Sequence, residues 1–202
     1  MRLAFLSSIF IGIFPLYAQI KLFGEAQGTT YSIQYYDSSN RDLQTEIDSL
    51  LYFFDLGVSI YHETSEITLI NKNESTIASN PYFIYCFDLA KLIWKQTDGA
   101  FDPTVYPLVK AWGFGPEANP NGKPSPRDRD SILHFVGFSK INIVNHQVIQ
   151  EDHRIQLDFN AFAQGYSVDV VAKYLEDRGI HDYLIEIGGE VFANGSNWFI
   201  GI

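Results

Sequence analysis

Alternating apolar and polar residues recur in three regions of the chain, and turn-forming residues split each region. A period of two predicts strand pairs joined by tight turns, because successive side chains of a strand point to opposite faces. The predicted strand regions are Leu22–Tyr36 with a break at the segment QGTT, Lys140–Val144 with Gln147–Gln150, and Tyr183–Ile187 with Glu190–Ala193. We therefore expect largely antiparallel β-structure.

Apolar residues at helical spacing lie between these regions and predict three helices. The first predicted helix is capped by Ser39 or Asn40 and has the apolar residues Leu43, Ile47, Leu50, Leu51 and Phe54. The second begins at Asn80-Pro81 and runs to about Gln96. The third starts at Ser167, stops at Gly179 and directs four apolar residues inward, namely Val168, Val171, Ala172 and Leu175. Asn119–Pro126, rich in Pro, Gly and Asn, is a predicted loop. Helices and strands mix without strict alternation, which favours an α+β fold with sheets flanked by helices.

Composition narrows the class of protein. The 202 residues suffice for one sizeable core or two small subdomains, and the net charge of -10 argues against nucleic acid or an anionic membrane surface as partner. Cys86 is the only cysteine, so the chain forms no internal disulfide and no multi-thiolate metal site. The 16 Phe and 12 Tyr suit both a packed core and a site that stacks a flat ligand.

The N-terminus has the layout of a secretory signal peptide. Arg2 is followed by the apolar run Leu3–Phe14, and Pro15–Ala18 ends it with a small residue. The run is too short to span a bilayer. We predict a signal peptide over residues 1–18 and an exported protein, periplasmic or at the periplasmic face of the inner membrane; a buried first strand or helix is the alternative.

Four stretches carry residues suited to ligand chemistry, and each also has an ordinary explanation. They are GTTYSIQYY from Gly28, SIYHETSEITLIN over Ser59–Asn71, DGAFDPTVYPLVKAWGFGP over Asp98–Pro116, and LDFNAFAQG over Leu157–Gly165. Taken singly, they read as a turn, a packing tyrosine, Asp-Gly and Asp-Pro turns, and an extended segment that leads into a helix. The last stretch is unusual because it carries Asp, Asn and Gln among Ala and Phe.

Together the four stretches resemble the bacterial FAD:protein FMN transferases, the ApbE-type flavin transferases, in the family's order from about Gly24 to Ile202. The segments DGAFDPTV-PL-WGFG, LDF-A-A-GYSVD and GGEV carry the resemblance. It implies an exported or membrane-tethered enzyme that moves FMN from FAD onto a Thr of an acceptor protein, using Mg²⁺. Two alternatives remain open: hydrolysis of FAD to FMN and AMP at the same site, and an exported FAD-binding protein without catalysis.

The same resemblance assigns site residues. It implies that Tyr61 lies against the isoalloxazine ring, that Ala100, Phe101 and Asp102 line the adenosine end, that Asp158 binds the cofactor, and that the backbone carbonyl of Ala161 binds the metal. Gln27 and Gln164 fall at cofactor-contacting positions where the family commonly has Met and Lys or Glu, so those contacts are expected to differ in kind.

The resemblance also indicates what to expect beyond this sequence. The family has a later His-containing motif and an Asp/Thr pair that completes the metal site, whereas this chain ends at NWFIGI. We therefore expect the catalytic residues beyond Ile202, with residues 19–202 forming the N-terminal portion of a flavin transferase domain. His146 and His153, in and near a predicted hairpin, are interpreted as surface residues.

Overall fold

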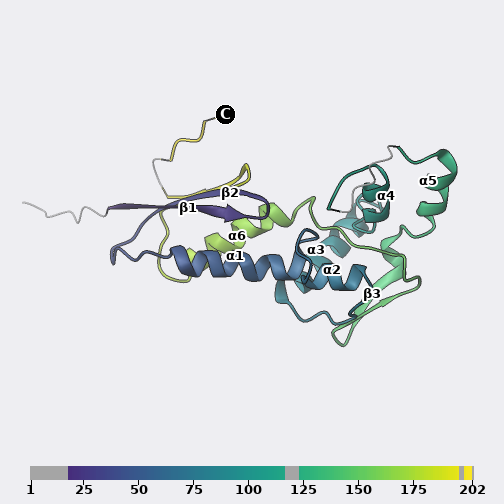
Figure 1. Ribbon diagram of the computed structural model, residues 1–202. Coiled ribbons are helices and arrows are strands. Elements are labelled where there is room, and N and C mark those ends of the chain that lie inside the picture. The colour runs from purple at the N-terminus through teal and green to yellow at the C-terminus, as the bar shows by residue number, and fades with distance from the viewer. Residues whose placement is uncertain (1–17, 117–122, 196–197, 202) are drawn as a thin grey trace, which may run out of the picture.

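The computed structural model describes residues 18–116, 123–195 and 198–201, so the predicted signal peptide lies outside the described residues except for Ala18. A four-stranded antiparallel sheet has the order β1-β2-β5-β6. Its strands are β1 (Gln19–Ala26), β2 (Thr29–Tyr36), β5 (Tyr183–Ile187) and β6 (Glu190–Asn194). Helices α1 (Gln44–Val58) and α6 (Ala163–Glu176) lie along one face of this sheet (Figure 1).

A second region beyond the sheet is mainly helical (Figure 1). It contains α2 (Glu66–Asn71), α3 (Pro81–Gln96), α4 (Tyr106–Ala111), α5 (Pro126–Leu133), the 3-10 helix η1 (Phe138–Lys140), and a hairpin of β3 (Ile141–Val144) and β4 (Gln147–Gln150). Among the described residues, none of the helices combines the length and apolar character needed to cross a membrane.

Two hydrophobic clusters form the core, and α1 contributes to both. Under the sheet, Ile47 and Leu51 pack with apolar residues of β2, β5 and α6. Further along the same helix, Phe54 and Val58 join the second cluster, which is formed largely by α3 and the segment before α6. The predicted α+β class with largely antiparallel sheets is confirmed.

Tight turns join the hairpins as the sequence predicted. Gln27-Gly28, Asn145-His146 and Gly188-Gly189 all have positive φ, between 49° and 95°. Two consecutive left-handed residues match the turn whose twist fits a two-residue hairpin. The segment QGTT is therefore a turn at its first two residues, and its two threonines already belong to β2.

Two predicted helix starts are wrong. Neither Ser39 nor Asn40 caps α1; the Asp42 carboxylate accepts a hydrogen bond from the Gln44 backbone N–H instead (3.0 Å). Helix α6 begins at Ala163 rather than Ser167, whose hydroxyl donates to the Gln164 carbonyl inside the helix (2.6 Å). Ser is ambiguous in sequence because it caps helices and also bonds back to the preceding turn.

Other local predictions fared better. Helix α3 begins at Pro81, with the Asn80 side chain accepting from the Tyr82 N–H (2.9 Å), and ends at Gln96 as predicted. Gly179 follows α6 with φ +76°. The predicted loop Asn119–Pro126 lies partly outside the described residues, and its last residue begins the unpredicted helix α5.

Asn71, at the end of α2, joins the helical region to the segment before α6. Its buried side chain donates to the Leu157 carbonyl (2.8 Å) and accepts from the Leu157 N–H (2.7 Å).

Asn71→Ala leaves both buried backbone groups of Leu157 unpaired, so we expect a loss of about 2–4 kcal/mol in the free energy of unfolding, measured by chemical denaturation. The exposed control Asn142→Ala should change it by less than about 0.5 kcal/mol. Equal effects of the two variants would contradict the assignment.

Candidate functional site

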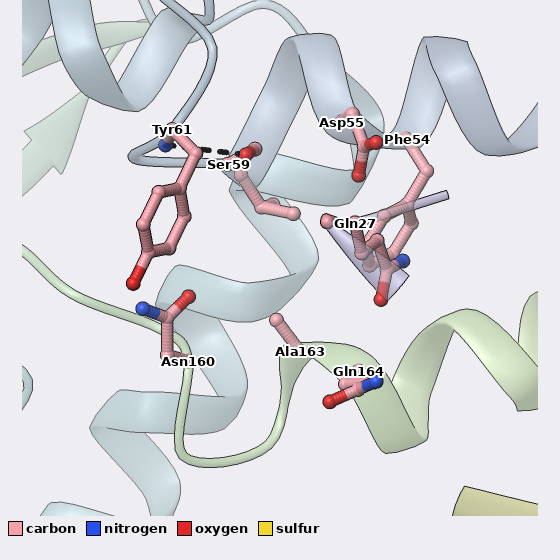
Figure 2. Close-up of a pocket in the computed structure, with 10 residues that line it drawn as sticks. Gln27, Phe54, Asp55, Ser59, Tyr61, Asn160, Ala163 and Gln164 are labelled. Carbon is pink, nitrogen blue, oxygen red and sulfur yellow. Dashed lines mark hydrogen bonds between the residues drawn. The ribbon is translucent and has the colours of Figure 1, made fainter. Parts of the chain in front are cut away.

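A cleft of about 460 Å³ opens where the tip of the β1–β2 hairpin meets the end of α1 and the start of α6. The residues lining it are Gln27, Gly28, Phe54, Asp55, Val58, Ser59, Tyr61, Asn160, Ala163 and Gln164 (Figure 2). Three residues predicted from sequence meet here, namely Gln27, Tyr61 and Gln164. The structure thus brings together positions that are widely separated along the chain.

The hairpin tip forms one wall of the cleft. Gln27 and Gly28 have φ of 56° and 73°, which are left-handed values that a tight hairpin turn needs. A Cβ added at Gly28 would meet no atom within 4 Å, so its φ, and not a close approach, favours glycine. In this structure Gly28 is the ordinary turn residue that the sequence left as an alternative.

Gln164 lies in the first turn of α6 and holds the helix to the β5–β6 turn. Its amide donates to the Ile187 carbonyl (3.3 Å). A Cβ at Gly188 would lie 1.8 Å from the Gln164 Nε2, so only glycine leaves room for this amide. The residue that differs from the family's Lys or Glu therefore has a structural contact as well as a place in the cleft.

Tyr61 places a solvent-exposed aromatic ring at the rim of the cleft. Its side chain is 62% exposed, and its backbone N–H donates to the Ser59 hydroxyl (3.3 Å) in the loop after α1. Phe54, in contrast, is buried at the inner wall, where its ring packs 5.6 Å from that of Tyr166. Figure 2 shows the Tyr61 hydroxyl directed toward Asn160. The cleft therefore offers an exposed ring face above an apolar base, an arrangement suited to a planar ligand.

Asp158 lies in an irregular segment that leads to Asn160 on the cleft wall. Its Oδ1 accepts from the Asn160 N–H (2.8 Å), and its own N–H donates to the Pro103 carbonyl (2.8 Å). Burial raises the pKa of the Asp158 carboxyl group. Ala161, one residue past Asn160, is exposed. The extended segment predicted before Asp158 forms a single isolated β-bridge, between Gln156 and Val105.

Ala100, Phe101 and Asp102 are not among the residues that line this cleft. Asp102 organises its own loop: Oδ1 accepts from the Thr104 N–H (2.8 Å) and Oδ2 from the Phe138 N–H (2.9 Å). Phe101 packs against Phe162, with ring centroids 6.0 Å apart, while Ala100 is exposed. The Pro103–Asp158 hydrogen bond sets this loop beside the Asp158 turn. A role at the adenosine end stays a prediction.

The oxygen donors near the cleft provide part of a ligand set for a hard cation. The Asp158 carboxylate and the backbone carbonyls of its turn are the oxygen type that Mg²⁺ prefers, with waters and phosphates completing its shell. In residues 18–116, 123–195 and 198–201, no three or more His, Cys, Asp or Glu side chains gather as a metal cluster. The oxygen ligands present are thus of the type that suits a magnesium ion, and they would fill only part of its coordination shell.

Sequence reasoning missed Asp55, Asn160 and Phe54. Asp55 lies on the side of α1 that faces the hairpin tip, and burial raises the pKa of its carboxyl group to about 6, partly offset by the Gln27 backbone amide. The signal in the sequence was an acidic residue between Phe54 and Val58, four positions after Leu51. That placement puts a carboxylate beside the buried stripe of a helix.

The fold and the cleft together define an α+β protein with a candidate ligand site, lined by aromatic and amide side chains, at the junction of its sheet and helices. A sequence profile described as the ApbE family matches residues 27–202. The chain belongs to the ApbE family, as the sequence motifs predicted.

Relatives with solved structures share this fold. The flavin transferase ApbE from Vibrio cholerae superposes with a TM-score of 0.82 at 34% identity, covering 90% of this chain and 61% of that one. The apo flavinyl transferase ApbE of Pseudomonas stutzeri gives 0.81 at 30% identity, covering 92% and 66%.

Curated relatives include the FAD:protein FMN transferase of Vibrio cholerae, 35% identical over 188 residues, which are 89% of this chain and 55% of that protein. That of Haemophilus influenzae is 33% identical over 193 residues, which cover 88% and 55%. The chain thus spans about half the length of the curated relatives it matches.

Asp55 should make stability fall as the pH rises. Its pKa increases on folding from 3.8 to about 6, so between these values the folded state binds more protons than the unfolded state. The contribution of Asp55 to the free energy of unfolding is fully present below the unfolded-state pKa of 3.8, and it is lost as the pH rises above the folded-state pKa of about 6. Urea denaturation of wild type and Asp55→Asn at about pH 4 and about pH 7 should show the wild type losing more stability than the variant. A pH dependence that is identical in both proteins would contradict the raised pKa.

Proposed function

We propose that the full-length protein is an FAD:protein FMN transferase, which moves FMN from FAD onto a Thr of an acceptor protein. The main observation behind this proposal is the exposed Tyr61 ring, which lines a cleft together with Gln27 and Gln164. The relatives that match the chain, which are flavin transferases and FAD:protein FMN transferases, support it.

In this proposal the cleft binds the flavin end of FAD. Tyr61 stacks on the isoalloxazine ring, because an exposed tyrosine face supplies contact area at a low cost in conformational entropy. The rest of the dinucleotide follows the Asp158 turn toward Ala100, Phe101 and Asp102, whose loop is joined to that turn through Pro103. The hydrogen bond from the Asp158 N–H to the Pro103 carbonyl joins the two loops and would help to keep the pyrophosphate in one orientation.

Asp158 and the Ala161 carbonyl would hold Mg²⁺ in this proposal. When bound, the ion would neutralise charge on the pyrophosphate during transfer. Asp158 suits this role because its carboxylate is desolvated and already oriented by the Asn160 N–H. Among the described residues of the cleft none is a histidine, and the resemblance places the family's histidine beyond Ile202.

A flavin-binding protein without catalysis is the second candidate. It is favoured by Gln27 and Gln164, which line the cleft at positions where the family commonly has other residues. Covalent FMN appearing on an acceptor peptide, with FAD and Mg²⁺ supplied, distinguishes the two candidates. Release of free FMN and AMP without labelling would instead indicate FAD hydrolysis.

Export is part of the proposal. Cell fractionation that finds the mature protein starting near Gln19 outside the cytoplasm would support it, and retention of residues 1–18 in a cytoplasmic protein would contradict it. The acceptor would then be a Thr-containing redox protein reached in the same compartment.

Tyr61→Ala in the full-length protein should weaken FAD binding by about 1–2 kcal/mol, the scale of an aromatic contact with its lost burial. Titration by flavin fluorescence quenching measures this. The matched control is Tyr36→Ala, because Tyr36 is also partly exposed but lies at the end of β2 away from the hairpin tip. Unchanged affinity in Tyr61→Ala would remove this tyrosine from the site.

Asp158→Asn should fold normally yet lose most FMN transfer. An Asn side chain can still accept from the Asn160 N–H, so the turn is kept while the charge is lost. The assay is covalent FMN on a Thr-containing peptide, with circular dichroism to check the fold. Asp152→Asn is the control, because Asp152 accepts an equivalent hydrogen bond from the Arg154 N–H (2.9 Å) at the surface. Transfer at the wild-type rate by Asp158→Asn would contradict its role.

A further inference from the structure

Two polar side-chain atoms at the cleft lack hydrogen-bond partners. In the part of the chain that the structure describes, Gln27 Nε2 and Asp55 Oδ1 are both buried and unpaired. One belongs to the hairpin turn and the other to α1, and both residues line the cleft. Figure 2 shows the Asp55 carboxylate directed toward Gln27.

Such a pair is costly and calls for a cause. A buried donor or acceptor without a partner destabilises the fold, and a charged group does so more strongly. The two atoms have opposite hydrogen-bonding character, since the amide nitrogen donates and the carboxylate oxygen accepts. They do not satisfy each other, although the Gln27 backbone amide faces the same carboxyl group. A ligand with an acceptor and a donor side by side would satisfy both.

The surroundings restrict the shape of such a ligand. Phe54 forms the buried base of the cleft, and the ring of Tyr61 is exposed at its rim. A planar ring system therefore fits between these two side chains. A planar ligand that carries adjacent N–H and C=O groups on one edge is a cyclic amide or a cyclic imide.

We propose that Asp55 and Gln27 form a recognition pair for the imide edge of a planar heterocycle. Asp55 accepts from the ring N–H, and Gln27 Nε2 donates to a neighbouring ring carbonyl. The identity of the ring rests on the proposed function: the isoalloxazine of FAD carries an N–H, at its position N3, between two carbonyls. The pair then determines which edge of the flavin enters the cleft.

Both residues are suited to this contact. Asp55 is held on α1, whose neighbouring residues Phe54 and Val58 are buried, so its carboxylate is preorganised. Gln27 lies on a turn, and the proposal requires its long side chain to rotate so that the two buried atoms become accessible to the ligand. Desolvation strengthens the hydrogen bond of a carboxylate, because the local dielectric is low. A glutamine at position 27 thereby supplies a donor that a methionine cannot.

The test compares two ligands, FAD and FAD methylated at flavin N3, which lacks the N–H. Both are titrated into the full-length protein by flavin fluorescence quenching. Wild type should bind FAD about tenfold more tightly than the methylated form, since the methyl group leaves the Asp55 acceptor unpaired. Asp55→Ala should bind FAD more weakly and bind the two ligands equally. Gln27→Met should weaken FAD but keep the preference, because Asp55 remains.

The control Asp88→Ala removes an exposed carboxylate of α3 and should leave both affinities unchanged. Asp55→Leu is the second variant if Asp55→Ala does not fold, because an apolar side chain removes the unpaired group and fills its space. A preference that survives in either Asp55 variant reflects only the size of the methyl group and overturns the proposal. Equal binding of the two ligands by wild type also overturns it. Absence of FAD binding by wild type overturns the proposed function as well.

Discussion

The burial of one face of α1 is the interaction on which the rest of the structure depends. Ile47 and Leu51 pack under the sheet, and Phe54 and Val58 pack one to two turns later in the helical region. A single rigid helix therefore sets the position of one cluster relative to the other. The cleft lies at this junction, so its geometry follows from the same packing.

Hydrogen bonds from two amide side chains hold the segment that precedes α6 and the start of α6 in place. Asn71 holds Leu157 through both of its backbone groups, and Gln164 ties α6 to the β5–β6 turn across Gly188. Each is a side chain bonded to backbone far away in sequence, which rigidifies a loop without a disulfide. The segment between these two anchors contains Asp158, Asn160 and Ala161. The proposed cofactor contacts therefore lie on a loop whose two ends are immobilised.

The charge of the chain shapes how it can bind an anionic dinucleotide. With a net charge of -10, attraction over long range does not supply the affinity. In the proposed function, stacking on Tyr61, directional hydrogen bonds and a cation held by oxygen ligands would supply the affinity instead. The desolvated carboxylates Asp55 and Asp158 fit this picture, because each gains from meeting a donor or a cation.

The sequence by itself determined the elements whose signals are local. The hairpin turns at Gln27-Gly28, Asn145-His146 and Gly188-Gly189 and the Asn80-Pro81 start of α3 follow from residues that are adjacent in the chain. The α+β class and the family motifs were readable for the same reason. Through the motifs the sequence also identified Gln27, Tyr61 and Gln164, which the structure places in one cleft.

Only the tertiary structure decided the features that depend on distant partners. Asp102 accepts hydrogen bonds from the Thr104 and Phe138 backbone N–H groups, and the second of these bonds spans 36 residues. The desolvation of Asp55 arises only when the hairpin tip closes over α1, because burial is a property of the assembled fold and not of the residue.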